Sequence, residues 1–273
     1  MSLQGKTLFI TGASRGIGRK IALKAAADGA NIVIAAKSAE PHPKLPGTIH
    51  TVAAEVEATG GKALALQLDV RDEDAVRTAM AQAAEHFGGI DVLINNAGAI
   101  KLVGVEQLPA KRFDLMFQIN TRAVMVCSQA ALPYLKQSGN GHILNLSPPL
   151  NLDSKWFAQH GPYTVTKYGM SMLTLGMHEE FKKYGISVNA LWPKTMIATA
   201  AIEFELGSRD AFKHARTPAI MADAAHTILC SEHRSISGRL LIDEDLLRER
   251  GQSDFEQYRI DANASLMPDL FVD

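Results

Sequence analysis

The sequence predicts an α/β protein built on one doubly wound, parallel sheet of seven strands. Three observations support this fold class. Short apolar runs alternate with longer amphipathic segments, the 273 residues are 47% hydrophobic, and neither repeats nor low-complexity tracts interrupt them. A chain of this length and composition can bury the core of one large domain. Strands that alternate with helices are joined by right-handed crossovers, which make the strands parallel.

Seven apolar runs are expected to be strands, and four amphipathic segments between them are expected to be helices. The strand runs are 7–11, 31–36, 63–68, 92–95, 142–146, 187–191 and 240–243, and the helical segments are 19–28, 73–87, 112–136 and 163–184. Ligands of such sheets bind beyond the carboxyl ends of the strands, so we expect the functional site there.

Three stretches depart from this alternation. The Pro-rich segment 38–47 and the long insertion 195–218 are expected at the surface. Residues 1–243 are expected to form the one domain. The polar tail 244–273, with its scattered aromatic residues, is expected to pack on that domain and not to form a second one.

The charge balance argues against large charged partners. With 28 basic and 29 acidic residues the net charge is -1, which offers no field to attract nucleic acid or an anionic membrane. No apolar run is long enough to span a membrane, and residues 1–6 lead directly into the first expected strand. Cys127 and Cys230 are too few for a disulfide framework. A small-molecule partner and a reducing, cytoplasmic location are therefore expected.

A glycine-rich turn follows the first strand and opens the first helix. Glycines let the backbone approach a phosphate, and the free N–H groups and dipole of a helix N-terminus suit a pyrophosphate. A glycine turn alone is a weak signal, but its place in the first βαβ unit is the one that a Rossmann-type dinucleotide-binding fold requires. The residues predicted to bind the cofactor in this turn are Gly12, Ser14, Arg15, Gly16, Ile17 and Gly18.

The end of the second strand indicates which dinucleotide binds. An NAD site places a carboxylate there for the ribose hydroxyls, but this chain has Ala36-Lys37-Ser38. Lys37 and Arg15 would offer two cations to a ribose 2′-phosphate, so the sequence predicts NADP(H). The alternative is that both cations are solvated and that Glu40 serves the ribose.

Tyr163 and Lys167 stand four residues apart at the start of a predicted helix and so share one face. Reduction of a carbonyl needs a proton donor, and a nearby ammonium would lower the phenol pKa toward the working range. The lysine could also hold the nicotinamide ribose. A lone Tyr-x-x-x-Lys is frequent in helices, but its combination with the glycine turn favours hydride transfer.

Three motifs together resemble the signatures of short-chain dehydrogenases: Thr11-Gly-x-x-x-Gly16-x-Gly18, Asn95-Asn96-Ala97-Gly98 and Tyr163-x-x-x-Lys167. The resemblance implies a catalytic acid/base, Tyr163, and its electrostatic partner, Lys167. Asn120 would organise a proton-relay water, although it could also be a helix-bend residue. The remaining implied cofactor contacts are Asp69 and Val70 at the adenine, Asn96, Ala97 and Gly98 at the adenosine ribose, and Pro193 and Thr195 at the nicotinamide. Asp69 and the Asn95-Asn96 pair could instead be simple turn formers.

Several stretches resemble one subgroup of that family, whose members carry an added sterol-carrier domain. They are Ala36-Lys37, Pro41-His42-Pro43-Lys44-Leu45, 146–151 and 190–195. No such domain follows in these residues, so lipid delivery is not expected of them. The family also implies a homodimer or homotetramer, supported on the exposed faces of helices 112–136 and 163–184.

The sequence departs from the family pattern at two places. The usual serine 13 residues before the tyrosine falls on Leu150, and the nearest candidate is Ser147, followed by Pro148. Ser147 could point at the substrate oxygen or cap the turn. The usual Pro-Gly after the sixth strand is Pro193-Lys194.

The insertion 195–218 corresponds to the family's substrate lid. Its apolar residues suggest a hydrophobic, lipid-like carbonyl or alcohol substrate, although they could simply pack a helix. They are Ile202, Phe204, Leu206 and Phe212.

Other classes fit less well. His226 and Cys230 have helical spacing, but two ligands do not make a zinc site, so no metal is expected. A hydrolase using Ser147, His160 and Asp153 would lack the Gly-x-Ser-x-Gly elbow. A carbohydrate epimerase would share the Tyr-x-x-x-Lys pair, but with a different glycine turn. The serious competitor is an NADP(H)-binding protein in which the Pro148 departure has disabled turnover.

Overall fold

The computed structural model describes residues 2–43, 45–206, 209–232 and 234–272. Its centre is a seven-stranded, all-parallel sheet in the order β3-β2-β1-β4-β5-β6-β7, so the predicted fold class is confirmed. The strands are β1 (Thr7–Thr11), β2 (Asn31–Ala36), β3 (Lys62–Gln67), β4 (Val92–Asn95), β5 (His142–Asn145), β6 (Ser187–Trp192) and β7 (Leu240–Ile242). Each expected strand is present, within one residue at either end.

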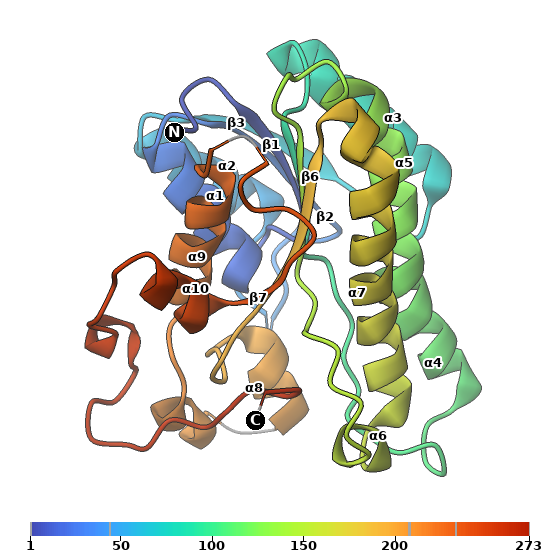
Figure 1. Cartoon of the computed structure of the whole chain (residues 1–273), viewed down its shortest axis with the longest axis vertical. Helices are drawn as coiled ribbons and strands as arrows, with labels where there is room; N and C mark the ends of the chain where they lie inside the picture. Colours follow the sequence, from blue (N-terminus) through green and yellow to red (C-terminus); the bar gives the residue numbers. More distant parts are fainter. Residues whose placement is uncertain (1, 44, 207–208, 233, 273) are drawn as a thin grey trace.

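Helices cover both faces of the sheet (Figure 1). One layer packs α1 (Gly16–Ala27), α2 (Ile49–Ala58) and α9 (Ala219–Leu229), and the other packs α3 (Glu73–Phe87), α5 (Ala123–Leu135) and α7 (Gly161–Phe181). The shorter helices are α4 (Ala110–Phe117), α6 (Lys155–Ala158), α8 (Ala200–Leu206) and α10 (Asp243–Glu249). No helix in the described residues is long and apolar enough to cross a membrane.

Alternation along the central strands divides the core into two layers. In β1, Leu8 and Ile10 belong to the cluster with α1, α2 and α9, whereas Phe9 belongs to the cluster with α3, α5 and α7. Successive strand side chains point to opposite faces, so a strand covered on both faces must be apolar throughout. This explains why the central runs read as continuous hydrophobic stretches.

The helices differ from the expectation at several places, since α2 and α9, among others, lie outside the expected helical segments. The sequence did not predict α2, which begins at a capping box between Thr48 and Thr51 directly after the Pro-rich segment. The expected helix 112–136 is divided by a π-helical turn, η1 (Gln118–Arg122), between α4 and α5. Such turns bend a helix and frequently occur at functional sites.

The tail does not end at α10. After the 3₁₀ turn η4 (Glu256–Tyr258) it runs back along the segment that follows β6, with Met196 N–H donating to Met267 O at 2.9 Å. Phe271 near its end is fully buried against the aromatic cluster of Tyr163, Tyr168 and Trp192. The tail therefore reaches the carboxyl ends of the strands, where the site is expected.

Candidate active site

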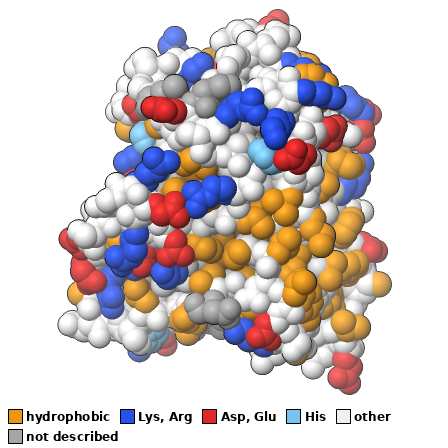
Figure 2. All heavy atoms as spheres, in the orientation of Figure 1, with side chains coloured by type: hydrophobic (Ala, Val, Ile, Leu, Met, Phe, Trp, Pro, Cys, Tyr) orange, Lys and Arg blue, Asp and Glu red, His pale blue; other side chains and the backbone are white. Residues whose placement is uncertain are grey.

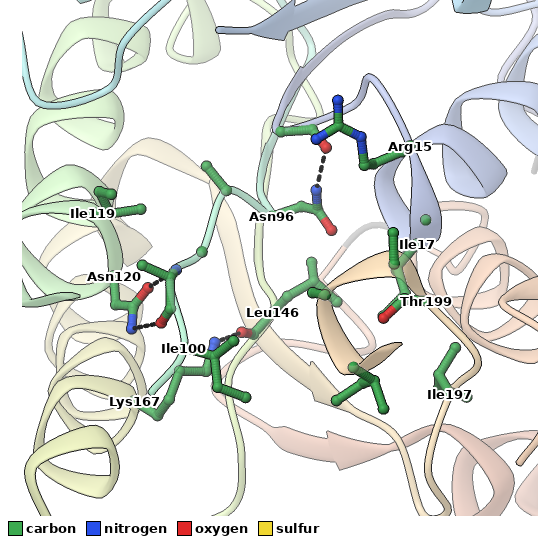
Figure 3. A pocket seen from close by; sticks show the side chains of 18 of the residues that line it. Arg15, Ile17, Asn96, Ile100, Ile119, Asn120, Leu146, Lys167, Ile197 and Thr199 are labelled. Atoms are coloured by element: carbon green, nitrogen blue, oxygen red, sulfur yellow. Dashed lines mark hydrogen bonds between the residues drawn. The ribbon is translucent and has the colours of Figure 1, made fainter. Parts of the chain in front are cut away.

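One cavity of about 660 Å³ opens beyond the carboxyl ends of the strands. Its walls come from the glycine turn, the ends of β2, β3 and β4, the helices η1 and α7, the segment after β6, α8 and the tail. Figure 3 shows the glycine-turn residues Arg15 and Ile17 on one side of this space and Asn120 and Lys167 on the other. A single cavity thus joins the two regions that the sequence motifs identified separately.

The glycine turn forms a cradle for an anion. Gly12 and Gly16 have φ values of +66° and +58°, which side chains rarely adopt. No side chain caps the N-terminus of α1, and its first turn carries no acidic residue. The free N–H groups of that turn therefore face the cavity without a competing carboxylate.

The Asn96 segment holds the glycine turn against β4. Thr11 Oγ1 accepts hydrogen bonds from the backbone N–H groups of Asn96 and Ala97, both at 3.1 Å, and Asn96 Nδ2 donates to Gly12 O at 3.0 Å. A Cβ at Gly18 would lie 2.4 Å from Asn96 Nδ2. Gly18 does not line the cavity, so the structure gives it a packing role and not the cofactor contact expected from the sequence.

The cations at the end of β2 are held in place. Arg15 donates from Nη2 to Ser38 Oγ at 2.8 Å and from Nε to Pro46 O at 2.9 Å, so the Pro-rich segment orients its guanidinium. Lys37 Nζ lies 3.2 Å from Asp69 Oδ2 and stays largely exposed. Ser38 also lines the cavity, whereas Glu40 is exposed outside it.

Asp69 is kept ionised by its neighbours. The Arg71 guanidinium, with a further contribution from Lys37, holds the Asp69 pKa well below its usual range. Asp69 and Val70 line the cavity together with Asn96, Ala97 and Gly98. This end of the cavity therefore combines fixed charges with exposed backbone.

Tyr163 and Lys167 both line the cavity from α7, and each residue is only 6% exposed. Lys167 Nζ donates to the carbonyl oxygen of Leu146, at the end of β5 (Figure 3). Burial lowers the Lys167 pKa to about 7, and Asp269 acts in the opposite direction. The two residues lie as the i, i+4 spacing predicts.

The expected lowering of the phenol pKa is not found. Burial raises the pKa of Tyr163, and the carboxylates of Asp269 and Glu205 raise it further. Charged phenolate is disfavoured in a dry, acid-flanked position, and Lys167 directs its hydrogen bond to Leu146. The phenol is therefore held protonated, which suits it to donate a proton.

Asn120 lies inside the π-helical turn. Its side-chain amide bonds both backbone groups of Ala99, accepting from N at 2.8 Å and donating to O at 2.9 Å, and it also donates to Thr166 Oγ1 at 2.9 Å. Asn120 thus ties the segment after β4 to α7, as a helix-bend residue would, while lining the cavity.

Two residues predicted by the resemblance lie off the cavity. Ser147 is 0% exposed, and its Oγ has no hydrogen-bond partner among the described residues. The next residue is bonded to α7, since Ser171 Oγ donates to Pro148 O at 2.6 Å. Thr195 is also buried beside the tail, next to Pro268, while Pro193 lines the cavity.

The tail supplies cavity residues that sequence reasoning missed. Met267, Pro268, Asp269 and Leu270 all line the cavity, and Phe271 stacks on Tyr163 with ring centres 6.3 Å apart. No motif or periodicity marks these positions. Other missed cavity residues, such as Ser38, Ala99 and Trp192, stand directly beside predicted ones, so their neighbours offered a signal for them.

Part of the insertion reaches the cavity, and the lid role expected of it stays a prediction. Ile202 of α8 lines the cavity, whereas Phe204 is 75% exposed and points away from the core. Phe212 is partly buried in the 3₁₀ turn η3 (Asp210–His214). The side chain of Leu206 and residues 207–208 lie outside the described residues, as does Lys44 of the Pro-rich segment.

The structure also shows where the residues of the alternative sites lie. His160 Nε2 and Ser147 Oγ are each buried without a partner in the described structure, and Asp153 bonds Lys155 N, so no hydrolase triad forms. Asp28 adds a third group beside His226 and Cys230. These three bond one another, with His226 Nε2 2.9 Å from Asp28 Oδ2, and they join α1 to α9.

The donor set fits a dinucleotide. Uncapped helix N–H groups and a positive-φ glycine turn lie at one end of the cavity, a phenol and an amine lie at the other, and the cavity is continuous between them. Comparison with known proteins agrees with this geometry. A model of the short chain dehydrogenase family matches residues 6–205. The chain belongs to the short-chain dehydrogenase family.

Individual members of the family resemble the chain over most of its length. Hydroxysteroid dehydrogenase-like protein 2 of Danio rerio is 56% identical over 99% of this chain, which spans 65% of that relative's length. The predicted subgroup is thereby confirmed. A short chain dehydrogenase structure from Mycobacterium thermoresistibile has a TM-score of 0.94 and 49% identity, covering 100% of this chain and 96% of its own.

A more distant member of the family was solved with a ligand. It is a short chain dehydrogenase from Burkholderia cenocepacia J2315 in complex with NADP, with a TM-score of 0.76 and 31% identity. It covers 89% of this chain and 97% of its own. The family model thus assigns residues 6–205 of this chain to a family of dehydrogenases.

Proposed function

We propose that this protein is an NADP(H)-dependent oxidoreductase that interconverts a carbonyl and a secondary alcohol. One observation supports this most strongly: Tyr163 and Lys167 line the same cavity as the glycine turn and the cationic corner of Arg15, Lys37 and Ser38. A proton donor thus shares one cavity with a site suited to a phosphorylated dinucleotide.

The preference for NADP(H) follows from charge at the end of β2. Lys37 and Arg15 stand there, Ser38 adds a hydroxyl, and Glu40 lies outside the cavity. A ribose 2′-phosphate would receive charge-assisted hydrogen bonds from these groups. The Burkholderia relative that binds NADP agrees with this choice. A dissociation constant lower for NAD than for NADP would contradict it.

The cofactor, Lys167 and Tyr163 would each have a separate role in the reaction. The bound nicotinamide supplies or accepts the hydride. Lys167 would hold the nicotinamide ribose, and Tyr163 would donate its phenolic proton to the substrate oxygen. Because the surroundings keep that phenol protonated, the site is suited to carbonyl reduction near neutral pH.

The substrate proposed is hydrophobic. The cavity wall beyond the glycine turn is mainly apolar, with Ile100, Leu102, Met196, Ile202 and Leu270. Burial of such surface favours a lipid-like chain on the substrate. The decisive assay is NADPH oxidation measured with a panel of ketones, aldehydes, quinones, 3-oxoacyl compounds and steroids.

A second candidate is an NADP(H)-binding protein without turnover. It is favoured by Ser147, which is buried away from the cavity and leaves the substrate oxygen without the usual serine. Both candidates predict a change in NADPH fluorescence on binding. Only the enzyme oxidises NADPH when a carbonyl panel is added, so binding without oxidation would favour the silent protein.

We also propose a homodimer or homotetramer. Apolar side chains gather on the face formed by α4, α5 and α7, on the lower right of Figure 2. The exposed ones are Phe117, Met125, Val165, Met172 and Leu175. Contiguous apolar surface of this kind is typical of protein interfaces. Light scattering after gel filtration would report the mass, and a monomer would contradict the proposal.

The location proposed is the cytoplasm. Cys127 and Cys230 form no disulfide, and burial raises the pKa of both thiols, to about 12 and about 11. Such thiols persist in a reducing compartment. Cell fractionation with an antibody to the protein tests this directly.

A further inference from the structure

Three side chains of types that bind metal ions meet between α1 and α9. His226 lies in the last turn of α9, and Cys230 directly follows that helix, so the two share one face. Asp28 directly follows α1 and stands 198 residues before His226 in the sequence. The two helices lie side by side in Figure 1. None of these three described residues lines the cavity, so the cluster lies outside the site of the proposed function.

The three possible ligand atoms lie close to one another. His226 Nε2 is 2.9 Å from Asp28 Oδ2 and 3.4 Å from Cys230 Sγ, and Cys230 Sγ is 3.7 Å from Asp28 Oδ2. Tetrahedral Zn²⁺ with one nitrogen, one oxygen and one sulfur ligand separates these atoms by about 3.3 to 3.6 Å. Shifts of less than about half an ångström would therefore let all three bind one ion.

The geometry does not suit a catalytic triad of cysteine, histidine and aspartate. Such a triad uses the two ring nitrogens separately, one toward the nucleophile and one toward the carboxylate. Here Nε2 of His226 faces both the Cys230 sulfur and the Asp28 oxygen. A single nitrogen that faces two other ligand atoms is the arrangement that one central ion requires.

The surroundings orient the carboxylate and leave an access route. Leu3 N donates to Asp28 Oδ2 at 2.8 Å, and hydrogen bonds of this kind orient metal-binding carboxylates. Lys24, whose charge acts on the cluster, is paired with Asp223 at 2.7 Å. The side chains of His226 and Asp28 are 27% and 30% exposed, so an ion and a water as fourth ligand could reach them.

We propose that Asp28, His226 and Cys230 form a zinc site that joins α1 to α9. A carboxylate and a thiolate carry two negative charges, which a divalent ion neutralises. Thiolate and imidazole ligands favour Zn²⁺ over Mg²⁺ and Ca²⁺, which prefer oxygen. Since α1 has 12 residues and begins in the glycine turn, the ion would lie about 18 Å from the cofactor end of the cavity and have a structural role.

The thiol must lose its proton to bind the ion. Burial and the charge of Asp28 raise the pKa of Cys230 to about 11, so the thiol is protonated at neutral pH before an ion binds. Coordination deprotonates a thiol, so Zn²⁺ should release about one proton per ion from Cys230. A pH indicator in weakly buffered solution measures this release, and Cys230→Ser should abolish it.

Cobalt provides a spectroscopic test of the ligands. The unaltered full chain, prepared without an affinity tag and treated with EDTA, is titrated with Co²⁺. We expect the visible bands of tetrahedral Co²⁺ and a near-ultraviolet charge-transfer band from the thiolate, and Zn²⁺ should remove both because it binds more tightly. Cys230→Ser should lose the charge-transfer band. The control Cys127→Ser, at the fully buried second thiol, should keep it.

Thermal midpoints test the structural role. Zn²⁺ at about 100 times its dissociation constant should raise the midpoint of the unaltered chain by about 5 °C, because the ion binds only the folded state. At the same concentration, His226→Asn and Asp28→Asn should lose most of this rise. Asparagine at position 28 still offers an acceptor to Leu3 N, so that variant removes the charge alone. The control His86→Asn, at an exposed histidine of α3, should keep the full rise.

Two results would overturn the proposal. One is the absence of a charge-transfer band in the unaltered protein, which would leave the three residues as a hydrogen-bonded cluster only. The other is a Zn²⁺ response that persists in both Cys230→Ser and His226→Asn, which would place the ion elsewhere. If Cys230→Ser does not fold, Cys230→Ala replaces it. No step uses NADPH, so failure of NADPH to bind would contradict the proposed function and leave the zinc site intact.

Discussion

The two ends of the cavity are built differently. The cofactor end consists of turns that directly follow β1, β2, β3 and β4, where Gly12, Lys37, Asp69 and Asn96 stand. The catalytic end combines α7 with the segment after β6, α8 and residues 267–270 of the tail. The first is made by local turns on a parallel sheet, and the second by segments far apart in sequence.

This difference also appears in the charges. At the cofactor end, Asp69 is firmly ionised between Arg71 and Lys37. At the catalytic end, burial brings the pKa of Lys167 down to about 7 and that of Asp269 up to about 7. The cofactor end should therefore bind with little dependence on pH, whereas the catalytic end should respond to it.

The largest expected effect separates chemistry from binding. Tyr163→Phe should lower turnover about 100-fold or more, because it removes the proton donor, and should leave the NADPH dissociation constant within about twofold. Stopped-flow turnover and fluorescence titration measure the two quantities. Tyr184→Phe, at a tyrosine remote from the cavity, is the control. Equal loss of binding and turnover would show that the two ends are not separable.

The next effect belongs to the cofactor end. Lys37→Ser should weaken NADPH binding about tenfold to a hundredfold, because a charge-assisted bond to the 2′-phosphate is lost, while NADH binding stays within about twofold. Asp69 keeps Arg71 in this variant. Isothermal titration with both cofactors provides the measurement, and Lys62→Ser, an exposed lysine outside the cavity, is the control. Equal weakening of both cofactors would contradict a 2′-phosphate contact.

A smaller effect is expected on the pH dependence of ligand binding at the two ends of the cavity. The Lys167 pKa is lowered to about 7, so its ammonium is lost as pH rises through that value. NADPH, which reaches both ends, should bind about two- to threefold more weakly at pH 9 than at pH 7. The fragment 2′,5′-ADP should bind equally at both pH values, because Asp69 stays ionised throughout. A parallel decline for both ligands would place the titrating group at the cofactor end.

The smallest effect is expected at Ser147. Because this side chain is fully buried outside the cavity, Ser147→Ala should leave kcat/KM within about twofold. A fall comparable with that of Tyr163→Phe would show that the loop rearranges when substrate binds. That result would indicate that Ser147 contacts the substrate during the reaction.

The sequence predictions were more accurate for the cofactor end of the cavity than for the catalytic end. The strands and the glycine turn were predictable because each depends on residues within a few positions of one another. Ser147 and Thr195 were placed from the family pattern, and neither lines the cavity. Both are buried, and the contacts of Pro148 with Ser171 and of Thr195 with Pro268 join segments far apart in the sequence. The helix α2 was missed because its start signal, Thr48, follows a segment that the prolines marked as irregular.

The sequence by itself determined the sheet, the glycine turn and the shared face of Tyr163 and Lys167, since periodicity and i, i+4 spacing are local properties of the chain. Only the tertiary structure decided that the tail closes the catalytic end. It also decided that burial and Asp269 hold the proton on Tyr163. Desolvation and long-range charge depend on which distant segments pack together, and no spacing within the sequence encodes that.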